Sequence, residues 1–510
     1  MASLVLALWV GRDEPLPFSG ALRPEVADAE NARPDGLPLQ AGSIAGAEDG
    51  AAALQARLEA LDQLVEAALR QTLPTARWQR ELTTLAYGEA QGHAGGHAGT
   101  YGHTGAYESK AAQARPAVAA PQGMIGHPAQ AASGAAPETQ VVRVYTVTGP
   151  CAPLRLGLEL LDRLTPPRGR VLEEREKLAA EERPAARELA PNSMAGQASS
   201  PGQAREPGHG ANRASSGPGM PSLADMADGK IRLAWTDTGH LDIFDRGRLT
   251  HRFVFPGREP QLADLARPLS RPALALVIDD MGQSLHAAES LAALPYPVTL
   301  AIWPHAPQAQ ATADLAAQRR LDVLAHVPME PLPRSDGTRL QPGQGALWAV
   351  MQPDQLRPAL KDNLSALPSA IGLNNHMGSA FTGNAASCRR LCAGLEGQGF
   401  FVLDSLTTPD SHLGAQARSL GLVSATRDVF LDTRRQTPAI LEALDHAASR
   451  ARSKGYAVAI GHPYDETLHA LRAWQDKAQV ALVPLRRLVW HLAQKDAQQR
   501  TVEAQRAAMR

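Results

Sequence analysis

Aromatic residues are scarce in this chain: they make up 4% of its 510 residues, whereas glycine (43) and proline (39) are plentiful. Long stretches of such composition bury little apolar surface and cannot pack a core. The length alone would suffice for two or three domains. We therefore expect a few folded regions separated by long linkers.

Neither sign of charge is in excess, since the chain contains 51 Lys and Arg residues and 52 Asp and Glu residues, for a formal net charge of -1. A protein that binds nucleic acid usually presents a basic surface to the phosphate backbone. The balance therefore argues against a nucleic-acid partner.

Cysteine is also rare, with only Cys151, Cys388 and Cys392 in the chain. Three cysteines are too few for a disulfide framework or a structural zinc site. The last two stand four positions apart in a segment with helical spacing, and we predict that they lie in a core.

No apolar run is long enough to cross a membrane: residues 4–10 are apolar, but a spanning helix needs about 20 such residues. The run also lacks the basic stretch that opens an export signal. We interpret residues 1–50 as an N-terminal segment that retains the end of an export signal or membrane tether. That interpretation predicts a periplasmic or membrane-anchored place in the cell envelope, while a cytosolic hydrolase stays open as an alternative.

The first half shows only short structured segments. Leucines and Val65 recur at helical spacing over 54–69, a strand pattern covers 141–147, and helical leucines occupy 154–164. These predict a small α+β region at 51–165, interrupted by a disordered Gly/Ala/His-rich stretch at 91–139 whose histidines fit a solvated linker better than a metal site. We expect a linker at 166–221 and a short β region at 222–270, with strands at 231–235, 241–244 and 251–255.

From residue 271 the pattern changes to short apolar runs that alternate with helical segments. The runs are 273–278, 298–303, 322–326, 370–373, 400–403, 420–423, 456–461 and 480–483, and the helices are 284–294, 308–320, 354–367, 386–398 and 438–454. Continuous apolar runs of this kind are typical of parallel strands covered by helices. We predict an α/β fold, a distorted (β/α) barrel of about seven strands at 271–490 that folds without the first half, and a charged tail at 491–510. The first run ends in Ile278-Asp279-Asp280-Met281-Gly282. A dinucleotide-binding sheet needs a glycine-rich motif at this place, so the sequence argues against that fold.

Polar residues follow these runs at the point where each strand should end, which is where barrels of this kind carry their catalytic groups. An Asp pair alone is often a helix cap, and a lone His is often a satisfied polar residue. Five such sites at strand ends are harder to explain in that way. The residues are Asp279, Asp280, His326, Glu330, Asn374, Asn375, His376, Ser379, Asp404 and His462.

Four motifs among them, in this order and spacing, resemble those of the divergent polysaccharide deacetylases. They are Val277-Ile278-Asp279-Asp280-Met281-Gly282, His326-Val327-Pro328-Met329-Glu330-Pro331, Asn374-Asn375-His376-Met377-Gly378-Ser379 and Ile460-Gly461-His462-Pro463. The resemblance covers about two-fifths of the chain. It implies a distorted barrel related to esterases that remove N- or O-acetyl groups from polysaccharides such as chitin-like or peptidoglycan chains, and a zinc or similar divalent ion held by one Asp and two His.

This resemblance assigns Asp280, His326 and His376 as ligands that leave one coordination position open, as amide hydrolysis requires. Asp279 becomes the base that takes a proton from water, and His462 the acid that protonates the leaving amine. Glu330 is either a further ligand or a partner that orients an imidazole. Asn374, Asn375, Ser379 and Asp404 are candidates for supporting or substrate contacts, and the backbone around 377–379 for an oxyanion site.

The chain departs from ordinary polysaccharide deacetylases at two places. Glu330 stands where those enzymes have a second histidine four residues after the first, and Asn374-Asn375-His376 replaces their Arg-Pro-rich groove motif. Two hypotheses follow. The first is a metal-dependent hydrolase of acetylated envelope polysaccharide, and the second is a non-catalytic module that keeps the fold to bind glycan or a partner protein.

Overall fold

A computed structural model describes residues 44–86, 139–166, 230–474 and 480–509. The expected export segment at 4–10 and the expected linkers at 91–139 and 166–221 lie outside the described residues, apart from their outermost positions. Residues 53–510 form one compact unit, to which the description below refers. Among the described helices, none combines the length and the apolar character that crossing a bilayer requires.

The first half contributes a five-stranded sheet. Its elements are α1 (Ile44–Thr72), β1 (Arg77–Ala86), β2 (Thr139–Thr148), α3 (Pro153–Leu164), β3 (Ile231–Trp235), β4 (Leu241–Asp245), β5 (Arg248–Val254), α6 (Glu259–Leu262) and the 3-10 turn η1 (Ala263–Ala266). The strand order is β1-β2-β5-β4-β3, and β2 pairs with β5 in parallel. The two regions that the sequence separates, 51–165 and 222–270, therefore form one sheet.

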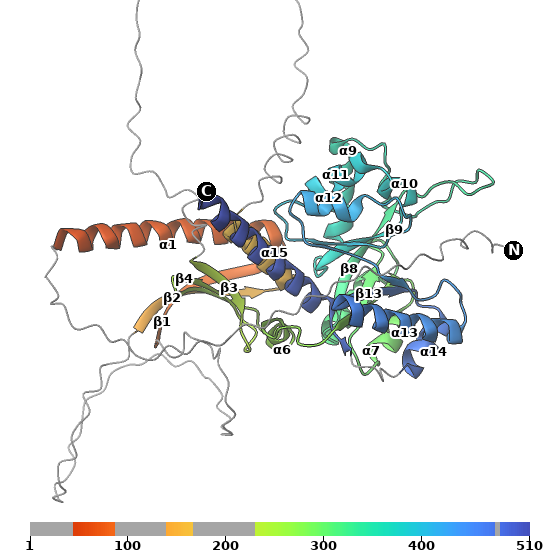
Figure 1. The fold of residues 1–510 in the computed structure, drawn as a ribbon, viewed down its shortest axis with the longest axis horizontal. Coiled ribbons are helices and arrows are strands. Elements are labelled where there is room, and N and C mark those ends of the chain that lie inside the picture. Colours follow the sequence, from red (N-terminus) through yellow and green to blue (C-terminus); the bar gives the residue numbers. More distant parts are fainter. Residues whose placement is uncertain (1–43, 87–138, 167–229, 475–479, 510) are drawn as a thin grey trace, which may run out of the picture. The chain divides into compact units, whose positions relative to one another are not determined.

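The second half contains a larger sheet with helices around it (Figure 1). Its strands are β6 (Ala273–Met281), β7 (Thr299–Ile302), β8 (Asp322–Met329), β9 (Gly372–Met377), β10 (Phe401–Asp404), β11 (Ser424–Thr426), β12 (Val429–Phe430), β13 (Tyr456–Gly461) and β14 (Ala481–Leu482). Its helices are α7 (Leu285–Ala292), α8 (Ala309–Gln318), α9 (Pro353–Ser365), α10 (Ser379–Thr382), α11 (Ala385–Leu395), α12 (Leu413–Ser419), α13 (Thr437–Lys454), α14 (Asp465–Ala473) and α15 (Leu485–Ala508).

The large sheet curls until its two edges meet. Its order is β11-β10-β9-β8-β7-β6-β13-β12 with β14 beside β6, so the edge strands β11 and β12 are separated in sequence only by Arg427 and Asp428. The backbone N–H of Arg427 donates to the carbonyl of Asp404, and that of Asp428 to the carbonyl of Val458, so this dipeptide links β10 to β13. The pairings between its strands are all parallel. The predicted α/β fold with a distorted barrel is confirmed.

Alternate residues of the strands enter two apolar cores. In β6, Leu274, Leu276 and Ile278 pack with the surrounding helices. Ala275 and Val277 point to the opposite face and join a cluster that continues into α1, α3, α15 and the small sheet. The first half and the barrel therefore share one core, which differs from the independent barrel domain that the sequence suggests.

Two further details differ from the sequence-based expectations. The segment expected as a charged tail at 491–510 is helical, because α15 runs without a break to Ala508 and buries Ala493, Ala497 and Arg500 on one side. Strand β1 was not expected, since it is an edge strand with polar and exposed residues such as Leu82. Cys388 and Cys392 lie buried in α11, in agreement with their predicted place in a core.

Candidate metal centre

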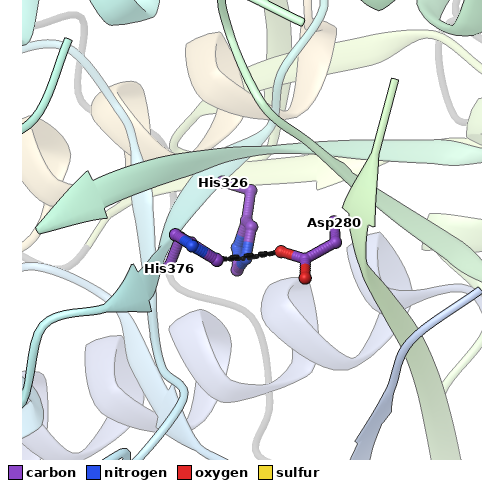
Figure 2. A group of neighbouring side chains, drawn as sticks. All are labelled: Asp280, His326 and His376. Atoms are coloured by element: carbon purple, nitrogen blue, oxygen red, sulfur yellow. Dashed lines mark hydrogen bonds and ion pairs between the residues drawn. The ribbon is translucent and has the colours of Figure 1, made fainter. Parts of the chain in front are cut away.

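Three candidate ligands meet toward the carboxyl ends of parallel strands of the large sheet: Asp280 in β6, His326 in β8 and His376 in β9 (Figure 2). Asp280 Oδ1 lies 2.8 Å from His376 Nδ1 and 3.1 Å from His326 Nε2, and the two ring nitrogens are 3.1 Å apart. A group of this composition can hold one metal ion.

The backbone of β6 changes course where it presents Asp280. The pairing of β6 with β7 shifts register between Ile278 and Met281, and Asp280 has a φ of 56°. Non-glycine residues seldom adopt this left-handed conformation, although Asp tolerates it better than most. Such a bulge re-aims a side chain at a functional edge, and here the Asp280 carboxylate points toward the two imidazoles.

The three donor atoms lie somewhat closer together than the ligands of one tetrahedral ion. For bonds of about 2.0–2.1 Å, two ligands of such an ion lie roughly 3.3–3.5 Å apart, and the observed separations are 2.8, 3.1 and 3.1 Å. A shift of a few tenths of an ångström would complete the geometry. The donor set of two imidazole nitrogens and one carboxylate oxygen suits zinc, which uses three protein ligands and an open position in catalytic sites.

Asn374 fixes the tautomer of His326. Its amide nitrogen donates to Asp279 Oδ1 at 2.8 Å and to Ser405 Oγ at 3.1 Å. Its oxygen Oδ1 therefore faces His326 Nδ1, 3.0 Å away, and can only accept. In the neutral form His326 thus carries its proton on Nδ1 and presents the lone pair of Nε2 to Asp280 and His376.

A lone pair that faces a carboxylate oxygen needs a proton or a cation between them. Burial opposes the charged form of His326, yet the nearby charges of Asp279 and Asp280 and the hydrogen bonds raise its pKa to about 8. Burial would raise the pKa of Asp280, but the hydrogen bonds with His326 and His376 hold it well below its ordinary value. Burial and the charge of His326 lower the pKa of His376. The cluster thus pairs an anionic carboxylate with imidazoles that converge on it.

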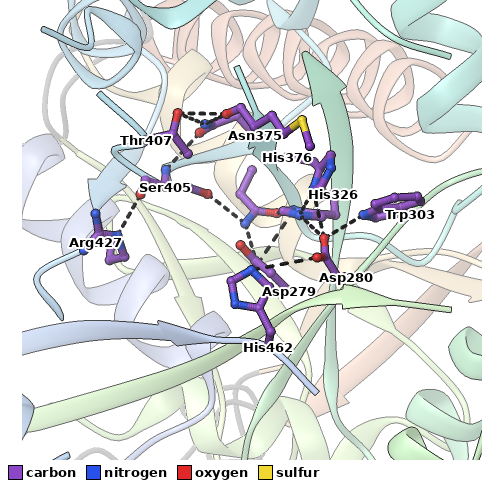
Figure 3. Close-up of polar contacts among 12 residues, drawn as sticks. Asp279, Asp280, Trp303, His326, Asn375, His376, Ser405, Thr407, Arg427 and His462 are labelled. Atoms are coloured by element: carbon purple, nitrogen blue, oxygen red, sulfur yellow. Dashed lines mark hydrogen bonds and ion pairs between the residues drawn. The ribbon is translucent and has the colours of Figure 1, made fainter. Parts of the chain in front are cut away.

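Asp279 lies on the Nδ1 side of His326 and is almost completely buried (Figure 3). Its Oδ1 is 3.7 Å from His326 Nδ1 and accepts from Asn374. Burial raises the pKa of Asp279, while the charges of His326 and His462 work in the opposite direction. Its second oxygen accepts no hydrogen bond from the described residues, so it is available to take a proton.

His462 approaches from the other side of the cluster, after β13. Its Nε2 lies 3.8 Å from Asp280 Oδ2, and its Nδ1 lies 3.0 Å from Asp432 Oδ1. Burial would lower the pKa of His462, but the hydrogen bond and the charge of Asp432 raise it. Asp432 itself accepts from the backbone N–H of His462 and from the hydroxyl of Thr467. The contacts with Asp432 therefore hold His462 so that its Nε2 faces the cluster.

Several contributors were not identified in the sequence. Asp432 follows β12, a strand of two residues that leaves no readable pattern. Trp303 closes the second apolar run, and its indole N–H donates to Asp280 Oδ1 at 2.9 Å while its ring packs against His376. Ser405 contacts Asn374. Ser405 follows a predicted strand together with Asp404, and Trp303 ends another, so the sequence marks their places, but it gives no such signal for Asp432.

Other predicted site residues take structural positions. The carboxylate of Glu330 accepts from the backbone N–H of Ala349 at 2.9 Å and is not one of the clustered ligands, which corrects the option of Glu330 as a ligand. Ser379 Oγ accepts from the backbone N–H of Leu332. Asp404 accepts from the hydroxyl of Ser411 and from the backbone N–H groups of Leu406 and of Gly414 in α12, and it is not one of the clustered ligands.

Asn375 holds the neighbouring loop. Its Oδ1 accepts from the backbone N–H of Ser405 at 2.9 Å, and its amide nitrogen donates to the carbonyl of Met377 at 2.8 Å. Met377 and Gly378 both have positive φ, so the chain turns sharply directly after His376. The oxyanion role expected for the backbone at 377–379 stays a prediction.

Comparison with known proteins gives relatives for the barrel region. The family model described as divergent polysaccharide deacetylase matches residues 276–489. The uncharacterized protein YibQ of Escherichia coli (strain K12) is 32% identical over 225 residues, which cover 43% of this chain and 69% of that protein. An uncharacterized protein of Haemophilus influenzae (strain ATCC 51907 / DSM 11121 / KW20 / Rd) is 34% identical over 200 residues, which cover 39% of this chain and 70% of that protein.

Among solved structures, the uncharacterized protein ATU2773 from Agrobacterium tumefaciens C58 is similar, with 22% sequence identity and a TM-score of 0.41. The match covers 45% of this chain and 94% of that chain.

Proposed function

The chain belongs to the divergent polysaccharide deacetylase family, and from this premise we propose that it is a metal-dependent hydrolase that removes acetyl groups from an envelope polysaccharide. The observation that supports the proposal best is the convergence of Asp280, His326 and His376 between a buried acid and a second imidazole. A site that only binds glycan has no need of an acid and a base on opposite sides of a metal centre.

In this proposal Asp280, His326 and His376 would hold one divalent ion, and the chemistry of the donor set favours zinc. When bound, such an ion polarises a carbonyl group and lowers the pKa of water. The indole N–H of Trp303 orients the Asp280 carboxylate. Asn374 keeps the Nε2 lone pair of His326 directed toward Asp280 and His376, where the ion would lie.

The proton transfers are assigned to the two flanking groups. Asp279 takes the proton of the attacking water, whose oxygen forms a bond to the acetyl carbon. The carbon–nitrogen bond of the acetamide then breaks, and His462, held by Asp432, donates a proton to the departing amine. The products are acetate and a free amine; an O-acetyl ester would release an alcohol in the same way.

The proposed partner is an acetylated polysaccharide or a peptidoglycan-like glycan, and the proposed location is the cell envelope, where such a substrate occurs. Neither nucleic acid nor a second protein is part of this function. The alternative module that only binds glycan shares the fold and the metal ligands, so an activity measurement separates the two.

The test combines metal content with acetate release. The purified chain should carry a divalent ion and release acetate from at least one of N-acetylated chitooligosaccharide, acetylxylan and peptidoglycan fragments. His462→Gln should abolish release and keep the ion, whereas His469→Gln on the exposed side of α14 serves as the control. Glycan binding without acetate release from any of these substrates would favour the binding module.

A further inference from the structure

A cavity lies apart from the metal centre, between the first half of the chain and the barrel. Its volume is about 500 Å³, and its walls come from the end of α1, the start of α3, helix α9 and the segment that connects α11 to β10. None of the residues of the metal centre lines it. The proposed deacetylation therefore does not account for this cavity.

Arg155 reaches the cavity from α3 and is buried, with 5% of its surface exposed. Its Nε donates to the carbonyl of Gln398 at 3.0 Å, and its guanidinium carbon lies 3.7 Å from the centre of the Phe400 ring. Glu159, one turn further along α3, accepts at 2.6 Å from Arg163 and acts on Arg155 through its charge. Within the described ranges, Arg155 has no ion pair.

A buried guanidinium without a carboxylate partner is costly, because the charge has lost its water. Burial accordingly lowers the pKa of Arg155 to about 9. Natural proteins usually pair such a group or use it to bind an anion. The cavity leaves space beside this arginine that an external anion can occupy.

The rest of the cavity wall also carries more cationic than anionic side chains. Arg70, Arg357 and Lys361 also line the cavity together with one carboxylate, that of Glu396, and Arg70 is itself paired with Glu66 at 3.0 Å. Between the cationic groups lie apolar side chains, among them Leu73, Leu364 and Phe400. A ligand that satisfies both parts of the wall carries an anionic group and an apolar group.

We propose that this cavity binds a small organic anion, a carboxylate or phosphate joined to an apolar chain, with the guanidinium of Arg155 as its anchor. Arginine suits such oxygens because its fork of N–H donors matches their geometry. The Nε–H already serves Gln398, so the terminal N–H groups contact the ligand. Lys361, on the exposed face of α9, adds charge at the rim.

The test is calorimetric titration of the full chain with octyl phosphate and with octanoate, and with 1-octanol as the uncharged probe. Both anions should bind, and 1-octanol should bind at least about tenfold more weakly, since it offers no charge to Arg155. Binding of only one anion identifies the headgroup that the site prefers. The proposal is overturned if neither anion binds or if 1-octanol binds equally well.

Two variants locate the site. Arg155→Met should weaken anion binding by roughly tenfold or more while the melting temperature holds or rises, because the variant removes a buried charge without a partner. Lys361→Gln, on the surface, should weaken binding by a smaller factor, and Lys495→Gln on α15, outside the cavity, should not change it. If Arg155→Met fails to fold, Lys361→Gln decides, and unchanged binding in that variant rejects the site.

Discussion

His326 Nε2 and His376 Nδ1 lie 3.1 Å apart and face the same oxygen of Asp280, although the two histidines stand 50 positions apart in the chain. Two imidazole nitrogens at this distance repel each other unless a proton or a cation sits between them. Strands β8 and β9 are neighbours whose register pairs His326 with Asn374 and Pro328 with His376, so the backbone itself brings the two rings to one edge.

The first prediction is that loss of either ring removes the ion. His326→Ala and His376→Ala should each reduce the bound metal from about one ion per chain to a small fraction, because two ligands seldom hold zinc at working concentrations. Metal analysis of purified protein measures this, with His469→Ala as a control on α14. Full metal occupancy in both variants would mean that the ion, if present, binds elsewhere.

The second prediction separates the adjacent acids. Asp280→Asn replaces an anionic ligand with a neutral one, so we expect the ion to be lost or weakly held, and excess metal to restore part of the activity. Asp279→Asn should keep the metal content but reduce the rate by about 10²–10⁴, since a general base commonly contributes that much, and added metal should not help.

The same pair of variants can reverse the assignment. If Asp279→Asn loses the ion and Asp280→Asn keeps it, the two roles are exchanged. If both keep the ion and any measured activity, the catalytic assignment is wrong and the binding module gains support. Asp314→Asn, on the exposed face of α8, is the control for a surface carboxylate.

Much of the barrel was predictable because buried parallel strands leave continuous apolar runs, and the strand ends then point to Asp280, His326 and His376. What the runs could not reveal is Asp432, because a strand of two residues has no pattern. The shared core was also hidden. Residues such as Ala275 and Val277 are apolar in either case, whether they fill a barrel interior or pack against another sheet. The sequence therefore does not reveal that α3 and α15 contribute to that core.

The third prediction concerns Asp432, which acts through His462. Asp432→Asn removes the charge that favours the protonated imidazole and leaves a weaker hydrogen bond at Nδ1. We expect kcat to fall by about 10–100-fold with KM and metal content nearly unchanged, because the acid is misplaced while the ligands are intact. Asp432→Glu should recover part of the rate if its carboxylate reaches Nδ1. A loss of metal in Asp432→Asn would instead indicate a general structural role.

The fourth prediction tests the corrected position of Glu330. Its carboxylate accepts from Ala349 and so fastens the loop that follows β8. Glu330→Gln keeps an acceptor there, and we expect unchanged metal content and activity within about twofold, whereas Glu330→Ala should expose the Ala349 amide to faster hydrogen exchange. A drop in metal content in Glu330→Gln would return Glu330 to the ligand set.

The last prediction concerns the dependence of the barrel on the first half of the chain. The sequence suggests that residues 271–490 fold alone, but Ala275, Val277 and Leu324 share one apolar cluster with α3 and the small sheet. The ring of Trp490 in α15 meets that of Trp235 in β3 at 6.2 Å, edge to face. Removing the first half would leave this surface in water, at a cost of about 25 cal/mol for each Å² that is uncovered.

We therefore expect a fragment of residues 271–510 to bind a hydrophobic dye and to unfold without a cooperative transition, while residues 53–510 melt in a single step. Trp235→Ala in the full chain should lower stability by about 3–5 kcal/mol, as large-to-small changes in a core do, although Trp235 lies outside the barrel. Calorimetry and dye fluorescence measure both effects. A fragment 271–510 that melts cooperatively near the temperature of the longer chain would show that the barrel is independent after all, and the shared core would then be a docking contact between two stable domains.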